Sequence, residues 1–113
     1  MNAKNIDPVV IIDTARTPMG GFQGALAALS AVDLGAAAIR SALRKSHLSG
    51  DDVEEVFMGC VLPAGLGQAP ARQAALGAGV TLDAGCTTIN KMCGSGMKAT
   101  MLAHDALLSL IHI

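Results

Sequence analysis

The stretch Thr87-Thr88-Ile89-Asn90-Lys91-Met92-Cys93-Gly94-Ser95-Gly96 decides how we expect this chain to fold. Its first three residues are all β-branched, which favours a short strand. The residues from Gly94 onward have the character of a helix. Cys93 is therefore expected where a strand gives way to a helix, within an α/β arrangement.

The segments before this junction extend the same pattern. Val9-Val10-Ile11-Ile12 is a continuous β-branched run, typical of a strand buried on both faces. Ser30 and Asp33 have the spacing of a helix capping box, and the helix that they open is expected to run to about Ser46.

A second strand is expected from Val53 to Val61. Pro70 suits the first turn of a short alanine-rich helix that ends near Gly77 or Gly79. The predicted order is therefore β-α-β-α-β-α, which indicates a parallel α/β layer. The chain has no internal repeat and no linker, so we expect no domain boundary within it.

Composition excludes several classes of protein. Of the 113 residues, 51% are hydrophobic and 15% charged, which favours a packed core over disorder. Two Phe, no Tyr, no Trp and 13 Gly favour closely packed helices and strands built from small residues. With a net charge of −1 and so few aromatic side chains, the chain offers neither a basic face nor stacking platforms for nucleic acid.

Three cysteines, Cys60, Cys86 and Cys93, neither pair evenly nor form a C-x-x-C motif. A disulfide framework and a zinc or other metal site are therefore not expected. Reduced cysteines favour a cytoplasmic location. The apolar run from Val9 to Ile12 is too short for a signal-peptide core or a membrane span, so no membrane association is expected.

Cys93 is the candidate nucleophile. Unpaired backbone N–H groups at a helix N-terminus favour the thiolate form of a cysteine placed there, and they can also stabilise an oxyanion. Gly94 and Gly96 lack Cβ atoms, which lets an acyl group approach closely. The competing interpretation is that Cys93 is a small buried side chain and that the glycines permit tight packing of helix on sheet.

Four segments, in order along the chain, resemble one family. Asn90-Lys91-Met92-Cys93-Gly94-Ser95-Gly96-Met97-Lys98-Ala99 resembles the N-x-x-C-G-S-G-x-x-A signature around the acyl-enzyme cysteine of thiolases. The other segments that resemble thiolases are Ala15-Arg16-Thr17-Pro18-Met19-Gly20-Gly21-Phe22-Gln23-Gly24, Met58-Gly59-Cys60-Val61-Leu62 with Gly65-Leu66-Gly67-Gln68, and Pro70-Ala71-Arg72-Gln73-Ala74-Ala75.

The resemblance covers roughly residues 8 to 108. It implies that residues 1–108 are a partial thiolase N-terminal domain, the incomplete N-terminal half of a duplicated five-layer αβαβα fold. Residues 109–113 do not match the family pattern. Our hypothesis is that this tail results from a truncated gene model.

The resemblance also implies an activity, acyl transfer between coenzyme A (CoA) thioesters, in fatty acid metabolism. Cys93 would accept the acyl group, and the branch most resembled makes acetoacetyl-CoA from two acetyl-CoA, or cleaves it in reverse. CoA thioesters would be substrates, with no permanently bound cofactor, and the full-length protein would form a homodimer or homotetramer. Alternatives are a non-catalytic partner in subunit association and a related condensing enzyme such as a ketoacyl synthase.

Thiolases also use a histidine and a second cysteine from motifs in their C-terminal half, and this chain contains neither motif. We therefore expect the chain alone to be inactive, and we assign no catalytic role to its histidines. His47 should cap a helix or lie on the surface, His104 should lie too far along the last helix to reach Cys93, and His112 falls in the tail that does not match.

Structural roles are expected for the remaining candidates. Cys60 and Cys86 should be small buried side chains, and Arg16 should organise a loop through an ion pair. Arg72 and Gln68 should serve structure or assembly.

Overall fold

The computed structural model describes residues 8–109. Along the chain the elements are helix α1 (Ala31–Ser46), a short 3-10 turn η2 (Gly50–Asp52), strand β1 (Glu55–Gly59), helix α2 (Pro70–Gly77), strand β2 (Gly85–Ile89) and helix α3 (Ser95–Leu108).

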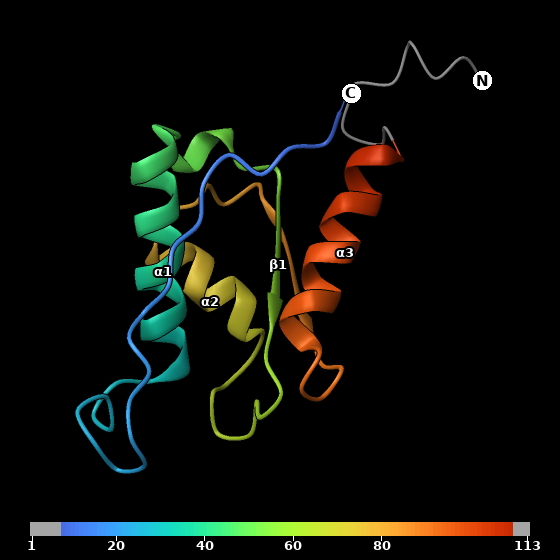
Figure 1. Cartoon of the computed structure of the whole chain (residues 1–113). Coiled ribbons are helices and arrows are strands. Elements are labelled where there is room, and N and C mark those ends of the chain that lie inside the picture. The colour runs from blue at the N-terminus through green and yellow to red at the C-terminus, as the bar shows by residue number, and fades with distance from the viewer. Residues whose placement is uncertain (1–7, 110–113) are drawn as a thin grey trace.

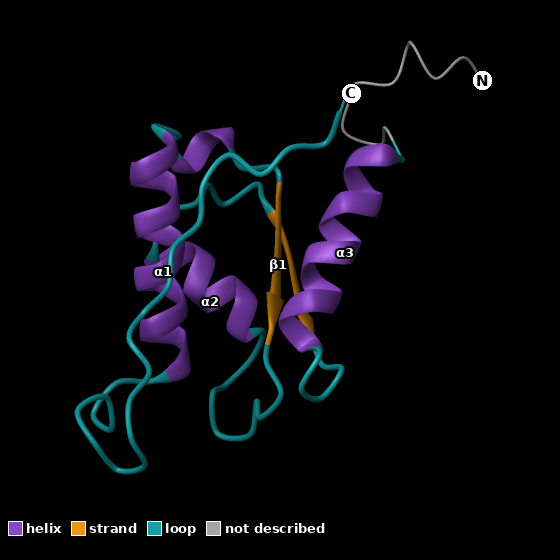
Figure 2. Cartoon of the chain, in the orientation of Figure 1, coloured by secondary structure: helices purple, strands orange, loops and turns teal. Residues whose placement is uncertain are grey.

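The elements form three layers, with a small parallel sheet between two layers of helices. β1 and β2 pair in parallel, with Glu55 opposite Gly85 and Gly59 opposite Ile89. Helix α2 packs against both strands and α1 packs against α2, while α3 lies on the other side of the sheet, mainly against β1 (Figures 1 and 2). The predicted parallel α/β class is confirmed.

Helix α1 begins and ends where its sequence signals place it. The Ser30 hydroxyl accepts a hydrogen bond from the Asp33 N–H at 3.0 Å, and the Asp33 carboxylate accepts one from the Ser30 N–H at 3.0 Å. Together these form the predicted capping box. His47 closes the helix in the left-handed region, with φ 58°, so its expected capping role is confirmed.

Helix α2 starts at Pro70, as expected, because proline has no N–H to leave unpaired in a first turn. The second predicted strand is present but shorter than Val53–Val61. The strand before the junction begins at Gly85, two residues earlier than its β-branched part.

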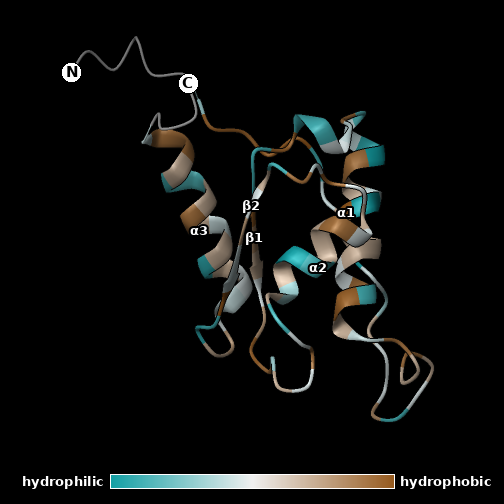
Figure 3. Ribbon diagram, turned by 180° about the vertical axis from the view of Figure 1, so that it is seen from behind, coloured by the Kyte–Doolittle hydropathy of each residue, from teal (hydrophilic) through white to brown (hydrophobic). Residues whose placement is uncertain are grey.

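The first predicted strand is wrong. Val10, Ile11 and Ile12 are 64–78% exposed and belong to no strand. The run passes the end of the sheet where β1 begins and then follows α1 (Figure 1), and Figure 3 shows it in brown. A β-branched run favours extended backbone, but a strand also needs a hydrogen-bonding neighbour, and this run has none among the described residues.

The core is built from small side chains. Ala75, Val80 and Ala84 form its buried cluster. Where α1 crosses α2, a Cβ added to Gly35 would lie 3.1 Å from the Cβ of Ala74, and one added to Gly77 would lie 3.2 Å from that of Ala36. The close packing expected from an alanine- and glycine-rich composition is confirmed.

Within residues 8–109, no helix combines the length and apolar character needed to cross a lipid bilayer.

Candidate active site

Three loops gather at one end of the molecule. Because β1 and β2 are parallel, the loops 60–69 and 90–94 that follow them leave the same edge of the sheet, and the loop before α1 reaches that end too (Figure 1). Ligands of parallel α/β sheets bind outside the carboxyl ends of the strands. This edge is therefore where a site is expected.

Cys93 lies on the loop that leaves this edge. Its side chain is exposed and its thiol is free, and the next residue, Gly94, caps the N-terminus of α3. The interpretation of Cys93 as a small buried side chain is therefore wrong. The thiol is open to solvent at the start of a helix.

The residue before the thiol has an unusual backbone. Met92 lies in the left-handed region with φ 49°. That conformation costs about 1–2 kcal/mol for a residue other than glycine, and it persists only where the surroundings hold it. The loop around Cys93 is therefore held by specific contacts.

Two side chains that the sequence did not single out make those contacts. Ser95 is only 5% exposed; its hydroxyl accepts from the Lys91 N–H at 2.9 Å and donates to the Met92 carbonyl at 2.6 Å. The side-chain oxygen of Asn90 accepts from the Met92 N–H at 3.0 Å, and the side-chain NH2 group of Asn90 donates to the Val61 carbonyl at 3.3 Å. The sequence feature that could have pointed to them is their position, because Asn and Ser beside a helix start commonly bond to nearby backbone groups.

Two N–H groups at this helix start are used inside the loop. The Gly94 N–H donates to the Lys91 carbonyl at 3.0 Å, and the Ser95 N–H donates to the Met92 carbonyl at 3.2 Å. Neither is therefore available to an acyl oxygen in this geometry. The N–H of Cys93 itself stays our predicted oxyanion donor.

The glycine that permits close packing of α3 lies on the strand. A Cβ on Gly59 would come within 2.6 Å of the Gly96 nitrogen and of the Ser95 carbonyl carbon. A Cβ on Gly96 would meet nothing within 4 Å. The competing interpretation, in which Gly94 and Gly96 permit the tight packing of helix on sheet, is wrong: Gly59 permits it, and Gly96 faces open space.

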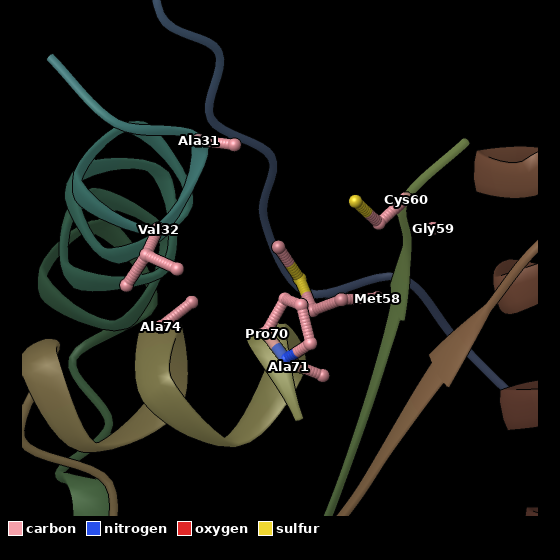
Figure 4. Close-up of a pocket in the computed structure, with 8 residues that line it drawn as sticks. All are labelled: Ala31, Val32, Met58, Gly59, Cys60, Pro70, Ala71 and Ala74. Atoms are coloured by element: carbon pink, nitrogen blue, oxygen red, sulfur yellow. The ribbon is translucent and has the colours of Figure 1, made fainter. Parts of the chain in front are cut away.

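The other two cysteines are half-buried rather than fully buried. Cys86 packs against the core cluster, and its sulfur lies 3.6 Å from the Ala84 carbonyl oxygen. Cys60 lines a small cavity between α1, α2 and β1, and Figure 4 shows its thiol turned toward Val32 and Met58. Both surroundings are mainly apolar, in keeping with structural roles.

The described histidines lie away from Cys93. His47 ends α1 at the opposite end of the molecule from the loop 90–94 (Figure 1). His104 is on α3, nine residues beyond Ser95, or about 14 Å along the helix axis, with its ring 3.3 Å from Asp105. His112 lies outside the described residues, and among those described no cluster of three side chains suits a metal ion.

Arg72 has a clear structural role. Its guanidinium donates to the carbonyls of Ala84 at 2.8 Å and Leu82 at 2.9 Å, which ties α2 to the segment before β2. Gln73 donates to the Gln68 carbonyl at 2.6 Å and to that of Leu66 at 2.8 Å, which shapes the loop 60–69. Gln68 therefore acts here through its backbone.

The ion pair near the N-terminus is not the predicted one. Lys45 pairs with Asp13 at 2.9 Å, whereas Arg16 is exposed and has no ion pair among the described residues. The hydrogen bond from Lys45, with a second from the Thr14 N–H, holds the pKa of Asp13 below its usual value. Lys45 therefore fastens this segment to the end of α1.

Fold and site together define a parallel α/β unit that exposes a cysteine thiol at a strand-to-helix junction. The model of the thiolase N-terminal domain matches residues 9–109. The chain belongs to the thiolase family, which confirms the resemblance and decides against the related condensing enzymes.

The chain is similar in sequence to known acetyl-CoA acetyltransferases and in structure to a thiolase. The chain is 51% identical over 108 residues to a mitochondrial acetyl-CoA acetyltransferase from Xenopus tropicalis, covering 96% of this chain and 26% of that one. It is 54% identical over 99 residues to acetyl-CoA acetyltransferase 1 from Arabidopsis thaliana, covering 88% and 24%. The crystal structure of Acat5 thiolase from Ascaris suum in complex with coenzyme A superposes with a TM-score of 0.86 at 39% identity, over 88% of this chain and 26% of that one. The chain thus spans about a quarter of the length of these relatives.

Proposed function

We propose that Cys93 accepts an acetyl group from acetyl-CoA and that this chain supplies the nucleophile of an acetyl-CoA C-acetyltransferase. The exposure of the Cys93 thiol at the start of α3 is the observation that carries the proposal. Similarity to acetyl-CoA acetyltransferases supports acetyl-CoA as the substrate, and the coenzyme A complex of the Ascaris protein supports a CoA thioester.

The proposed step exchanges one thioester for another. The Cys93 sulfur attacks the thioester carbonyl, and an oxyanion forms that the Cys93 N–H would stabilise. The oxyanion collapses, the bond from carbon to the CoA sulfur breaks, and the proton lost by Cys93 ends on the CoA thiol. Cys93 then carries the acetyl group, which keeps its carbonyl reactive for transfer to the α-carbon of a second acetyl-CoA.

Mass spectrometry tests the proposal directly. After incubation with acetyl-CoA, the chain should gain an acetyl group on a peptide that contains Cys93, and Cys93→Ser should abolish it. Cys60→Ser is the matched control and should leave the adduct in place, because Cys60 is half-buried and lines a cavity that Cys93 does not line. An adduct on Cys60 or Cys86 instead of Cys93 would refute the assignment.

Full turnover is proposed only for the whole protein. The chain alone should form the acetyl adduct without releasing acetoacetyl-CoA, and the whole protein should be a homodimer or homotetramer. Three free cysteines favour a reducing compartment, and we keep the cytoplasm as our prediction, although the Xenopus relative is mitochondrial by name. Subcellular fractionation tests the compartment.

A second candidate function is association with a complete thiolase subunit. Helix α3 exposes Met97 by 74%, Met101 by 52% and Leu107 by 54%, and an apolar helix surface favours a protein partner. Co-elution of the chain with a full-length thiolase in size-exclusion chromatography would support this role. Independent elution of the two would count against it.

A further inference from the structure

The hydrogen bonds of the loop 90–95 converge on Met92. The side chain of Asn90 accepts a hydrogen bond from the Met92 N–H at 3.0 Å. The hydroxyl of Ser95 donates one to the Met92 carbonyl at 2.6 Å. Both polar groups of the Met92 backbone are thus held by side chains. These contacts oppose the return of Met92 from the left-handed region to the conformations that methionine prefers.

The same two side chains anchor the loop to the rest of the molecule. Asn90 reaches the Val61 carbonyl at 3.3 Å, beyond the end of β1. Ser95 is buried at the start of α3, where the backbone of β1 at Gly59 approaches too closely to leave room for a Cβ. The loop is therefore fixed both to the segment that follows β1 and to helix α3.

Rotation about the Met92 backbone would turn the next residue, Cys93. We propose that Asn90 and Ser95 are positioning residues, which hold Met92 in its left-handed conformation and thereby aim the Cys93 thiol at the acyl carbonyl. This inference rests on the proposed acyl transfer. The two side chains act through the backbone of Met92 and need not touch the substrate.

The first test compares acetylation with alkylation at Cys93. Ser95→Ala and Asn90→Ala should each lower the rate of acetylation by acetyl-CoA about tenfold, the loss expected when a hydrogen bond that holds the loop is removed. Alkylation of Cys93 by iodoacetamide needs an exposed thiolate but no alignment with a bound acyl carbonyl, so its rate should stay close to that of the parent. Thr100→Ala, which removes an exposed hydroxyl that donates to the Gly96 carbonyl at 3.1 Å on the same helix, should change neither rate.

Asn90→Asp separates the two contacts of Asn90. A carboxylate can still accept from the Met92 N–H but cannot donate to the Val61 carbonyl, so this variant should keep more acetylation than Asn90→Ala. A role confined to overall stability would instead raise the alkylation of the half-buried Cys60 and Cys86 in step with the loss of acetylation.

Amide hydrogen exchange tests the hold on the Met92 backbone without relying on acetylation. Ser95→Ala should speed exchange at Lys91 and Asn90→Ala at Met92, with helix α2 unchanged. If the parent chain is acetylated, rates in Ser95→Ala and Asn90→Ala equal to the parent rate overturn the positioning role. If the parent is not acetylated, the proposed function fails, and unchanged exchange at Lys91 and Met92 overturns the inference as well.

Discussion

Gly59→Ala tests the contact between β1 and the start of α3. The added Cβ would lie 2.6 Å from two backbone atoms of Ser95 and Gly96, whereas ordinary contact begins at 3.4 Å. The strand and the helix must therefore separate by about 0.8 Å, the difference between those distances. Overpacking against backbone costs about 1–3 kcal/mol, and we expect the free energy of unfolding to fall by that amount.

Gly96→Ala is the matched control on the other side of the same contact. Its Cβ would meet nothing within 4 Å, and Gly96 lies inside α3. Alanine has the higher helix propensity, so we expect the free energy of unfolding to rise by about 0.5–1 kcal/mol. Two chemically identical substitutions on facing residues should therefore act in opposite directions.

Urea unfolding followed by far-UV circular dichroism measures both effects, since the chain has no Trp or Tyr for fluorescence. The pair also tests whether β1 and α3 pack as the structure shows. If Gly59→Ala is as stable as the parent, or Gly96→Ala is less stable than the parent, the packing argument is wrong.

Two further substitutions follow from polar contacts. Arg72→Lys should lower the free energy of unfolding by about 1–3 kcal/mol, because lysine cannot bond to the carbonyls of Ala84 and Leu82 together; an unchanged urea midpoint would contradict this. The Ser30 hydroxyl and N–H hold the pKa of Asp33 below its usual 3.8, so the stability that it contributes is present above pH 3.8 and is lost as the pH falls through the lowered value. Asp33→Asn should therefore lose less stability between pH 6 and pH 3 than the parent, and an equal loss in both proteins would argue against the capping box as its source.

Local signals predicted the helices well. Ser30 with Asp33, and Pro70, act on backbone groups one turn away, so their effect can be inferred from sequence spacing. The strand at Val9–Ile12 was predicted wrongly because its residues determine a preference for extended backbone but not a neighbour to pair with.

The site was predicted only in part, because local sequence patterns reveal local features and not long-range contacts. The position of Cys93 at a strand-to-helix junction follows from local pattern, and its role as the nucleophile stays a prediction. The packing role of Gly59 and the bond from Asn90 to Val61 join residues 29 or more positions apart, and spacing alone does not reveal such contacts. The ion pair of Asp13 with Lys45 is another long-range contact, and the sequence had instead suggested an ion pair of Arg16.

The contact of α1 with α2 shapes which mutations this protein tolerates. In most cores the damaging substitutions remove atoms and leave cavities. Here the facing residues, Gly35 and Ala36 with Ala74 and Gly77, have almost no side chain to remove. Harmful changes at this contact are therefore additions, and a single extra methyl group should be selected against more strongly than a lost one.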